Sequence, residues 1–255
     1  GSEVALVNSI PEEVHRNRSY GARIATHLTR SADGKEFLMD MHLGREWILG
    51  SLPIDGGDFQ HWQTFDRCFN HAQFSPTDPD FALIAQDRWT DLITGEGGDY
   101  YNRIWTIRRG EQAKPIYPDN QFGHEFWDAD GEHIWYVDYG ECTYKVRVSD
   151  GQTEVVWPRG NCHTDCDATG RYLVGDIDTY LWSAKGCKVG FFNRDTGRDI
   201  NIVSDLPCYE LGNQYHIHPH PQFCAGDEFV VYTTTVNGPG DVAICRTSEL
   251  IDASR

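Results

Sequence analysis

Three histidines at alternate positions form the clearest chemical signal in the sequence, within the segment NQYHIHPHPQF of residues 213–223. Two prolines in this segment fix their own φ and bias the residues before them to extended backbone, so we expect a strand-like segment. Alternate side chains of an extended chain share one face, with Cα atoms roughly 6 to 7 Å apart. His218 and His220 can therefore converge on one metal ion, whereas His216 and His220 lie too far apart for this.

The same type of residue recurs along the chain in a repeated pattern. A histidine is followed by an Asp/Gly turn and then by a run of β-forming residues. The five histidines are His27, His71, His124, His163 and His220. Their spacing is that of four-stranded β-meanders, which predicts the blades of a β-propeller. A residue that recurs at one place in every blade forms a ring around the propeller axis, so we expect these histidines to be neighbours.

Composition supports this fold class. The 255 residues include 25 glycines, 12 tyrosines, 12 phenylalanines and 8 tryptophans, which favours β-structure with many turns. Alternating runs such as EFLMDMHL and HIWYVDY are separated by polar turns, and no long helical period is present. We therefore predict an all-β fold, a single β-propeller domain over residues 1–255 with about five four-stranded blades.

Charge and cysteine spacing exclude several classes of function. The formal net charge of −17 repels polyanions, so nucleic-acid binding is not expected. The sequence contains no long apolar run, so we expect no membrane span. The eight cysteines form no CxxC pair, which argues against a zinc ribbon. The leading Gly-Ser resembles a cloning remnant, so a signal peptide could have been removed; a secreted or periplasmic location is favoured over a cytoplasmic one, and the oligomeric state is open.

A third imidazole completes a plausible ligand set. His163, one blade before the HxH pair, would join His218 and His220, and Gln214 or Asn213 could add an oxygen. Imidazole-rich sites with open water positions suit Mn²⁺, Zn²⁺, Fe²⁺ or Ni²⁺, and nearby carboxylates leave Ca²⁺ as a less suited alternative. The sequence therefore predicts a divalent-metal site.

Two stretches resemble known families. HPHPQFCAGDEFVVYTTTVNGPGDVAI and GHEFWDADGEHIWYVD are similar to the corresponding blades of oligogalacturonate lyases and of propeller ulvan lyases, and the resemblance covers about residues 71–244. These families are β-propellers, usually of seven blades, that cleave uronic-acid polysaccharides by β-elimination. The resemblance implies an acidic oligo- or polysaccharide substrate and a divalent metal, commonly manganese. With about five blades, either the ring closes with five or the chain lacks blades of a seven-bladed ring.

The oligogalacturonate lyase resemblance implies particular residues. Its metal-binding pattern falls on His163, His218, His220 and, with a shifted spacing, Gln214. Its base, a histidine in a GHE context, matches His124, and its upstream arginine matches Arg103. These residues would hold the metal, remove the proton and contact the substrate carboxylate.

The ulvan lyase resemblance implies a different set. A histidine that opens an NHAQFSP-like strand matches His71, a tyrosine acid matches Tyr144, and a downstream arginine matches Arg159. Tyr139 competes with Tyr144 for the role of acid. The two assignments cannot both be complete, and which histidine is the base is open at this point.

Two other classes of function also remain open. A propeller glycoside hydrolase would use paired carboxylates. The available ones are Asp87, Glu125, Asp128, Asp165 and Asp176. A non-catalytic propeller would be a binding scaffold whose histidines are structural. Elimination leaves an unsaturated, ultraviolet-absorbing product and hydrolysis does not, while metal analysis separates a metal site from a scaffold.

Overall fold

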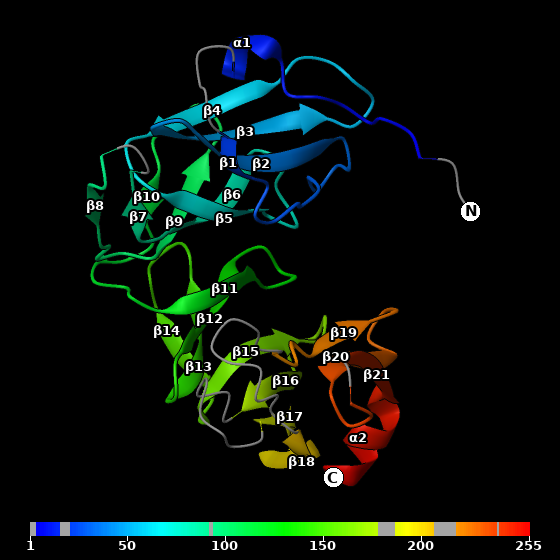
Figure 1. The fold of residues 1–255 in the computed structure, drawn as a ribbon. Helices are drawn as coiled ribbons and strands as arrows, with labels where there is room; N and C mark the ends of the chain where they lie inside the picture. The colour runs from blue at the N-terminus through cyan, green and yellow to red at the C-terminus, as the bar shows by residue number, and fades with distance from the viewer. Residues whose placement is uncertain (1–3, 16–20, 92–93, 178–186, 207–217, 239) are drawn as a thin grey trace. The chain divides into compact units, whose positions relative to one another are not determined.

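The computed structural model describes residues 4–15, 21–91, 94–177, 187–206, 218–238 and 240–255 (Figure 1). Gln214 and His216 lie outside these residues. The chain divides into two compact units, Gly1–Gln121 and Phe122–Arg255. The single domain that we expect from the sequence therefore stays a prediction.

Unit 1 contains two four-stranded antiparallel sheets. A short helix, α1 (Glu12–His15), precedes them. The first sheet has the order β1 (Gly21–Ile24), β2 (Glu36–Leu43), β3 (Glu46–Pro53) and β4 (Gln60–Phe65). The second has the order β10 (Lys114–Pro115), β9 (Ile104–Arg108), β6 (Phe81–Gln86) and β5 (Phe69–Phe74), with the hairpin β7 (Trp89–Thr90) and β8 (Gly97–Gly98) inserted after β6. Both sheets are therefore meanders, the second with an insertion.

Unit 2 contains three further meanders. The first comprises β11 (Gly123–Trp127), β12 (His133–Asp138), β13 (Cys142–Arg147) and β14 (Thr153–Trp157). The second comprises β15 (Asn161–Cys166), β16 (Tyr172–Ile177), β17 (Cys187–Asn193) and β18 (Arg198–Leu206). In the third, the described residues form three strands, β19 (Gln222–Cys224), β20 (Phe229–Thr234) and β21 (Asp241–Arg246), which are followed by the helix α2 (Thr247–Ala253).

The predicted turns join the first two strands of these sheets. Gly34, Gly131 and Gly170 have φ values of 75°, 68° and 67°, a left-handed conformation that glycine adopts without a Cβ clash. Each donates its backbone N–H to the carbonyl three residues earlier, on Ser31, Asp128 and Asp167 respectively. The sequence repeat therefore corresponds to a structural repeat.

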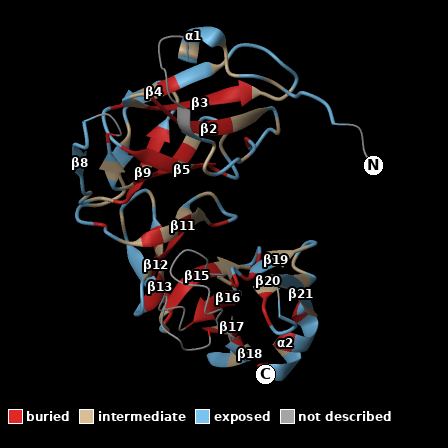
Figure 2. Cartoon of the chain, viewed as in Figure 1, coloured by how far each residue is buried: buried red, intermediate tan, exposed pale blue. Residues whose placement is uncertain are grey.

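Burial differs between the strands of one meander. In unit 2, β15 and β16 are mostly buried, whereas the last strand, β18, is mostly exposed (Figure 2). Large apolar side chains fill the core between neighbouring sheets of this unit, among them Trp135, Trp157 and Leu173. Burying such side chains contributes about 1.5–3 kcal/mol each to folding. His163 thus lies on one of the well-buried strands of unit 2. No helix of the described residues has both the length and the apolar character that crossing a bilayer requires.

Candidate metal centre

Three imidazoles converge in unit 2. His163 lies on β15, and His218 and His220 lie in the segment before β19. The ring centroid of His163 is 3.4 Å from that of His220 and 4.9 Å from that of His218, and the centroids of His218 and His220 are 6.1 Å apart. One nitrogen from each ring lies within 4.8 Å of the others. The structure therefore brings together three of the predicted metal ligands.

A buried carboxylate on β16 orients this group. Asp176 accepts hydrogen bonds from the backbone N–H of His163 at 2.7 Å and of His220 at 3.2 Å, and its carboxylate lies 2.7 Å from Nδ1 of His163. Burial disfavours the Asp176 anion, but the His163 imidazole and the two backbone donors outweigh burial, so the pKa of Asp176 is lowered. With Nδ1 of His163 engaged, its Nε2 is the nitrogen left to bind an ion. Such a carboxylate–histidine pair commonly orients a metal ligand.

His124 stands beside the three imidazoles. It lies on β11, and its ring centroid is 4.0 Å from that of His163 and 6.3 Å from that of His220. Tyr139 packs edge-on against the His124 ring at 5.3 Å. Burial, reinforced by His163, lowers the pKa of His124 to about 3. The imidazole is therefore neutral near pH 7.

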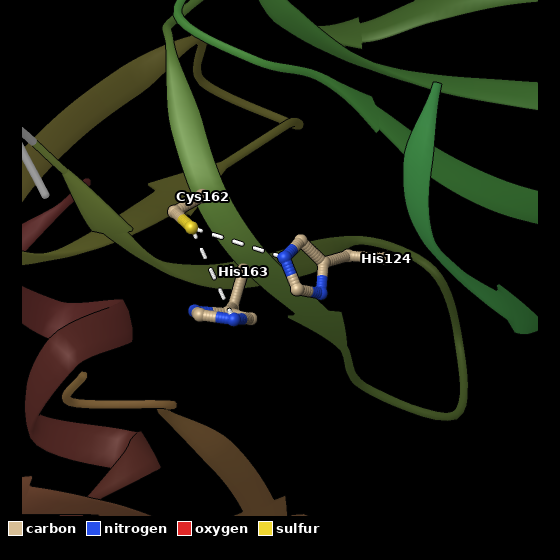
Figure 3. A group of neighbouring side chains, drawn as sticks. All are labelled: His124, Cys162 and His163. Carbon is tan, nitrogen blue, oxygen red and sulfur yellow. Dashed lines mark hydrogen bonds between the residues drawn. The ribbon is translucent and has the colours of Figure 1, made fainter. Parts of the chain in front are cut away.

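Cys162 is a potential ligand that sequence reasoning missed. Its Sγ lies 3.8 Å from Nε2 of His124 and 3.9 Å from Nε2 of His163 (Figure 3). In a regular strand Cys162 and His163 would point to opposite faces. The pairing of β15 with β16 shifts register between Asn161 and Thr164, and such a bulge redirects neighbouring side chains. A sequence signal for this was absent, because a bulge is defined by the pairing of two strands.

The bulge recurs at the histidine of other sheets. The pairing of β5 shifts register around His71, and the pairing of β11 shifts around His124. Both histidines have positive φ, 51° and 50°, and His220 has a φ of 44°. A left-handed backbone is uncommon for residues other than glycine, although histidine is among the enriched ones. These positions therefore share a strained local backbone as well as a residue type.

Unit 1 has its own histidine group. The rings of His27 and His71 stack with centroids 4.7 Å apart and planes 10° apart. The buried Arg103 has its Nη2 3.1 Å from Nδ1 of His71 and its Nη1 3.3 Å from the carboxylate of Asp87. Two residues implied by different family resemblances, His71 and Arg103, are thus in direct contact.

Tyr144 and Arg159 occupy other surroundings in unit 2. The Tyr144 ring stacks on Tyr136 at 5.3 Å between ring centroids. The guanidinium of Arg159 pairs with Asp199 and donates a hydrogen bond of 3.3 Å to Asn201. The catalytic roles of Tyr144 and Arg159 stay predictions.

Comparison with curated proteins gives two relatives that are similar in sequence. No protein-family model matches the chain. An oligogalacturonate lyase of Dickeya dadantii is 22% identical over 204 residues, which is 68% of this chain and 48% of that protein. An oligogalacturonide lyase of Pectobacterium atrosepticum is 24% identical over 196 residues, with the same coverage. The chain thus spans about half the length of these curated relatives.

A solved structure decides the fold. An oligogalacturonate lyase in complex with manganese matches 95% of this chain and 68% of its own, with a TM-score of 0.73 and 16% sequence identity. The fold is an all-β propeller built of four-stranded blades. The predicted fold class is therefore confirmed. The similarity in sequence and fold is to oligogalacturonate lyases, and the ulvan lyase part of the resemblance stays a prediction.

Proposed function

We propose that the chain acts in the β-eliminative cleavage of uronic-acid oligosaccharides, with oligogalacturonate as the first candidate substrate and a divalent ion held by His163, His218 and His220. The convergence of these imidazoles carries the proposal. The similarity to oligogalacturonate lyases supports it independently. Ulvan and glucuronate-containing glycans are the other candidate substrates.

The donor set fits a divalent transition metal. Asp176 holds Nδ1 of His163 and the backbone N–H of His220, so the ring of His163 and the backbone of His220 are placed before an ion binds. Imidazole nitrogens suit manganese or zinc better than calcium. Manganese is our first choice, because a related lyase structure is a manganese complex. When bound, the ion would supply electrostatic neutralisation of the substrate carboxylate, which makes the neighbouring C–H more acidic.

The side chains around the ion then have separate tasks. His124 is the proposed base: its neutral imidazole takes the proton from C5 of the uronate as the C4–O4 bond breaks and a C4–C5 double bond forms. The departing O4 receives a proton from a tyrosine or from water, with Tyr139, beside His124, and Tyr144 as the candidates. Arg103 and Arg159 are candidates for contact with the carboxylate.

Two of the five carboxylates available to a hydrolase are engaged by other partners. Asp128 accepts a hydrogen bond from Nε1 of Trp135 at 2.9 Å and pairs with Nζ of Lys145 at 2.5 Å. Asp176 is fully buried and holds His163 and His220. Acidic residues fixed by such partners are poorly suited to protonating a glycosidic oxygen, which argues against these two as the catalytic pair of a hydrolase.

The broader setting completes the proposal. An acidic protein that binds an acidic sugar needs a locally positive centre, which the ion and the arginines would provide. We propose that residues 1–255 belong to one propeller domain with no nucleic-acid or membrane partner, in a secreted or periplasmic setting.

One assay tests the function. The metal-stripped protein is supplied with Mn²⁺ and with oligogalacturonate, ulvan or glucuronate-containing oligosaccharides, and ultraviolet absorbance of the unsaturated product is followed together with reducing ends. We expect absorbance to rise with oligogalacturonate and to disappear in His218→Ala. The surface variant His61→Ala serves as the matched control, since His61 contacts Thr64 on an exposed part of β4. New reducing ends without absorbance would replace the proposal with hydrolysis, and no turnover with any substrate would favour a scaffold.

A further inference from the structure

A second set of donors lies next to the three-histidine site. His124, Cys162 and His163 offer one nitrogen, one sulfur and one nitrogen, all within 4.8 Å of one another (Figure 3). In a tetrahedral site with zinc-like bond lengths, sulfur and nitrogen ligands lie roughly 3.5 Å apart. The observed Sγ–Nε2 distances of 3.8 and 3.9 Å need only a small contraction to reach that value.

We propose that His124, Cys162 and His163 form a thiolate-containing site for a thiophilic divalent ion such as Zn²⁺ or Cd²⁺, and that this site competes with the three-histidine site for His163. Cys162 is a reduced thiol, buried in the bulge of β15. When the ion binds, the thiol proton passes to the buffer and the sulfur becomes a ligand. A soft thiolate selects zinc-like ions over manganese, which prefers harder donors.

Competition follows from the chemistry of His163. Nδ1 of this ring lies 2.7 Å from the carboxylate of Asp176, which leaves Nε2 as its metal-binding nitrogen. Nε2 has a single lone pair and binds one ion at a time. Both donor sets contain His163, so an ion on the Cys162 side removes one ligand from the ion on the His218 side.

An ion bound on the Cys162 side would also affect the proposed elimination reaction. An ion bound there engages Nε2 of His124, whose lone pair is then unable to accept a proton. This consequence rests on the proposed function, because it takes His124 as the base. A thiophilic ion would therefore inhibit elimination in two ways, by withdrawing His163 from the Mn²⁺ site and by blocking His124.

Binding of Cd²⁺ alone tests the site without any assay of activity. Cd²⁺ is titrated into the metal-stripped protein while the ultraviolet thiolate-to-cadmium absorption band is followed. We expect the band in wild type and a loss of at least about 100-fold in Cd²⁺ affinity in Cys162→Ser, since losing even a residue that only supports a ligand typically costs about 10- to 100-fold. Cys142→Ser is the matched control, a buried cysteine of the same unit outside both donor sets, and should retain the band.

Further variants separate the two sites. His218→Ala should lose Mn²⁺ binding, measured by electron paramagnetic resonance, and keep the cadmium band. His124→Ala should lose the cadmium band and keep Mn²⁺ binding. If Cys162→Ser does not fold, the result with His124→Ala alone decides whether the second site exists. His163→Ala should lose both. A cadmium band that survives in His124→Ala and in folded Cys162→Ser would overturn the proposal.

Competition is measured with both ions present. We expect Cd²⁺ to displace Mn²⁺ from wild type, and displacement from Cys162→Ser to need at least about tenfold more Cd²⁺. Equal displacement from both proteins would overturn the competition. If wild type shows these ion-binding results but no lyase activity, the proposed function fails and the second site stands.

Discussion

The two units place the same repeated histidine in opposite electrostatic surroundings. In unit 1, a ring nitrogen of His71 contacts the guanidinium of Arg103. In unit 2, a ring nitrogen of His163 contacts the carboxylate of Asp176. A guanidinium donor occupies the lone pair of the imidazole and repels a cation, whereas a carboxylate partner makes the remaining nitrogen a better metal ligand.

This contrast shows that the sequence repeat determines where each histidine lies in its sheet, whereas side chains from neighbouring segments determine what that histidine can bind. His71 and His124 both lie at β-bulges and both have positive φ. His124 nevertheless lies against further imidazoles, while His71 lies against an arginine and a stacked histidine. We therefore propose that metal binding and proton abstraction belong to unit 2, and that the histidine group of unit 1 has a different role. Three experiments test this proposal, and a fourth measures how a buried histidine of unit 1 affects stability at low pH.

The largest effect is expected on turnover. His124→Ala should lower kcat for elimination by about 10²- to 10⁴-fold, because it removes the proposed base. His71→Ala, its counterpart in unit 1, should lower kcat far less, because the ring of His71 lies against an arginine and not against the imidazoles of unit 2. Steady-state kinetics with oligogalacturonate and saturating Mn²⁺ measure both. A greater loss of kcat in His71→Ala than in His124→Ala would reverse the roles of the two units.

Metal affinity gives the next effect. His163→Ala should weaken Mn²⁺ binding by at least about 100-fold, because a direct ligand is lost. His71→Ala should leave Mn²⁺ affinity unchanged, and titration followed by electron paramagnetic resonance compares the two. Similar losses in both variants would mean that metal binding is not confined to unit 2.

The orienting carboxylate should have a smaller effect. Asp176→Asn keeps the size of the side chain but removes the anion that holds His163, so Mn²⁺ affinity should fall by about 10- to 100-fold. Asp87→Asn is the matched change beside Arg103 in unit 1 and should leave Mn²⁺ binding as in wild type. Wild-type affinity in Asp176→Asn would show that the carboxylate serves folding alone.

The smallest effect concerns the stability of the fold and a histidine of unit 1, His42. This residue belongs neither to the His27–His71 pair nor to the imidazole cluster of unit 2. His42 is buried and stacks on Trp47 at 4.3 Å, and burial lowers its pKa. Because the unfolded state protonates near pH 6.5 and the folded state does so only at lower pH, its contribution to stability is lost as pH falls below about 6.5. The slope from this group is at most about 1.4 kcal/mol per pH unit.

His42→Phe tests this effect, since it keeps a ring on Trp47 and removes the titrating group. Urea unfolding between about pH 7 and pH 5 should show a smaller loss of stability in the variant than in wild type. Parallel pH profiles for the two proteins would rule out His42 as a source of acid sensitivity.

Much of the scaffold could be predicted from local sequence. The Asp/Gly turns at Gly34, Gly131 and Gly170 are visible because a left-handed turn calls for glycine. The alternation in HxHP predicted that His218 and His220 face one place, and the repeat pointed to His163 as their partner. These features depend on a few neighbouring residues or on a fixed spacing.

Other parts of the site depend on strand pairing, which the sequence does not show. Asp176 reaches His163 because β15 pairs with β16, and Cys162 joins the group through a bulge in that pairing. The contact between His71 and Arg103 likewise links strand β5 to the residue just before β9. Spacing along the chain predicted which residues recur, but not which partner each would meet.

The left-handed backbone at His71, His124 and His220 places folding and chemistry in conflict. Glycine would relieve about 1–2 kcal/mol of steric cost at such a position. Selection for thermal stability alone should therefore favour glycine at residues 71, 124 and 220, and the selected proteins should lose the proposed activity. Selection for product formation should restore histidine at these positions.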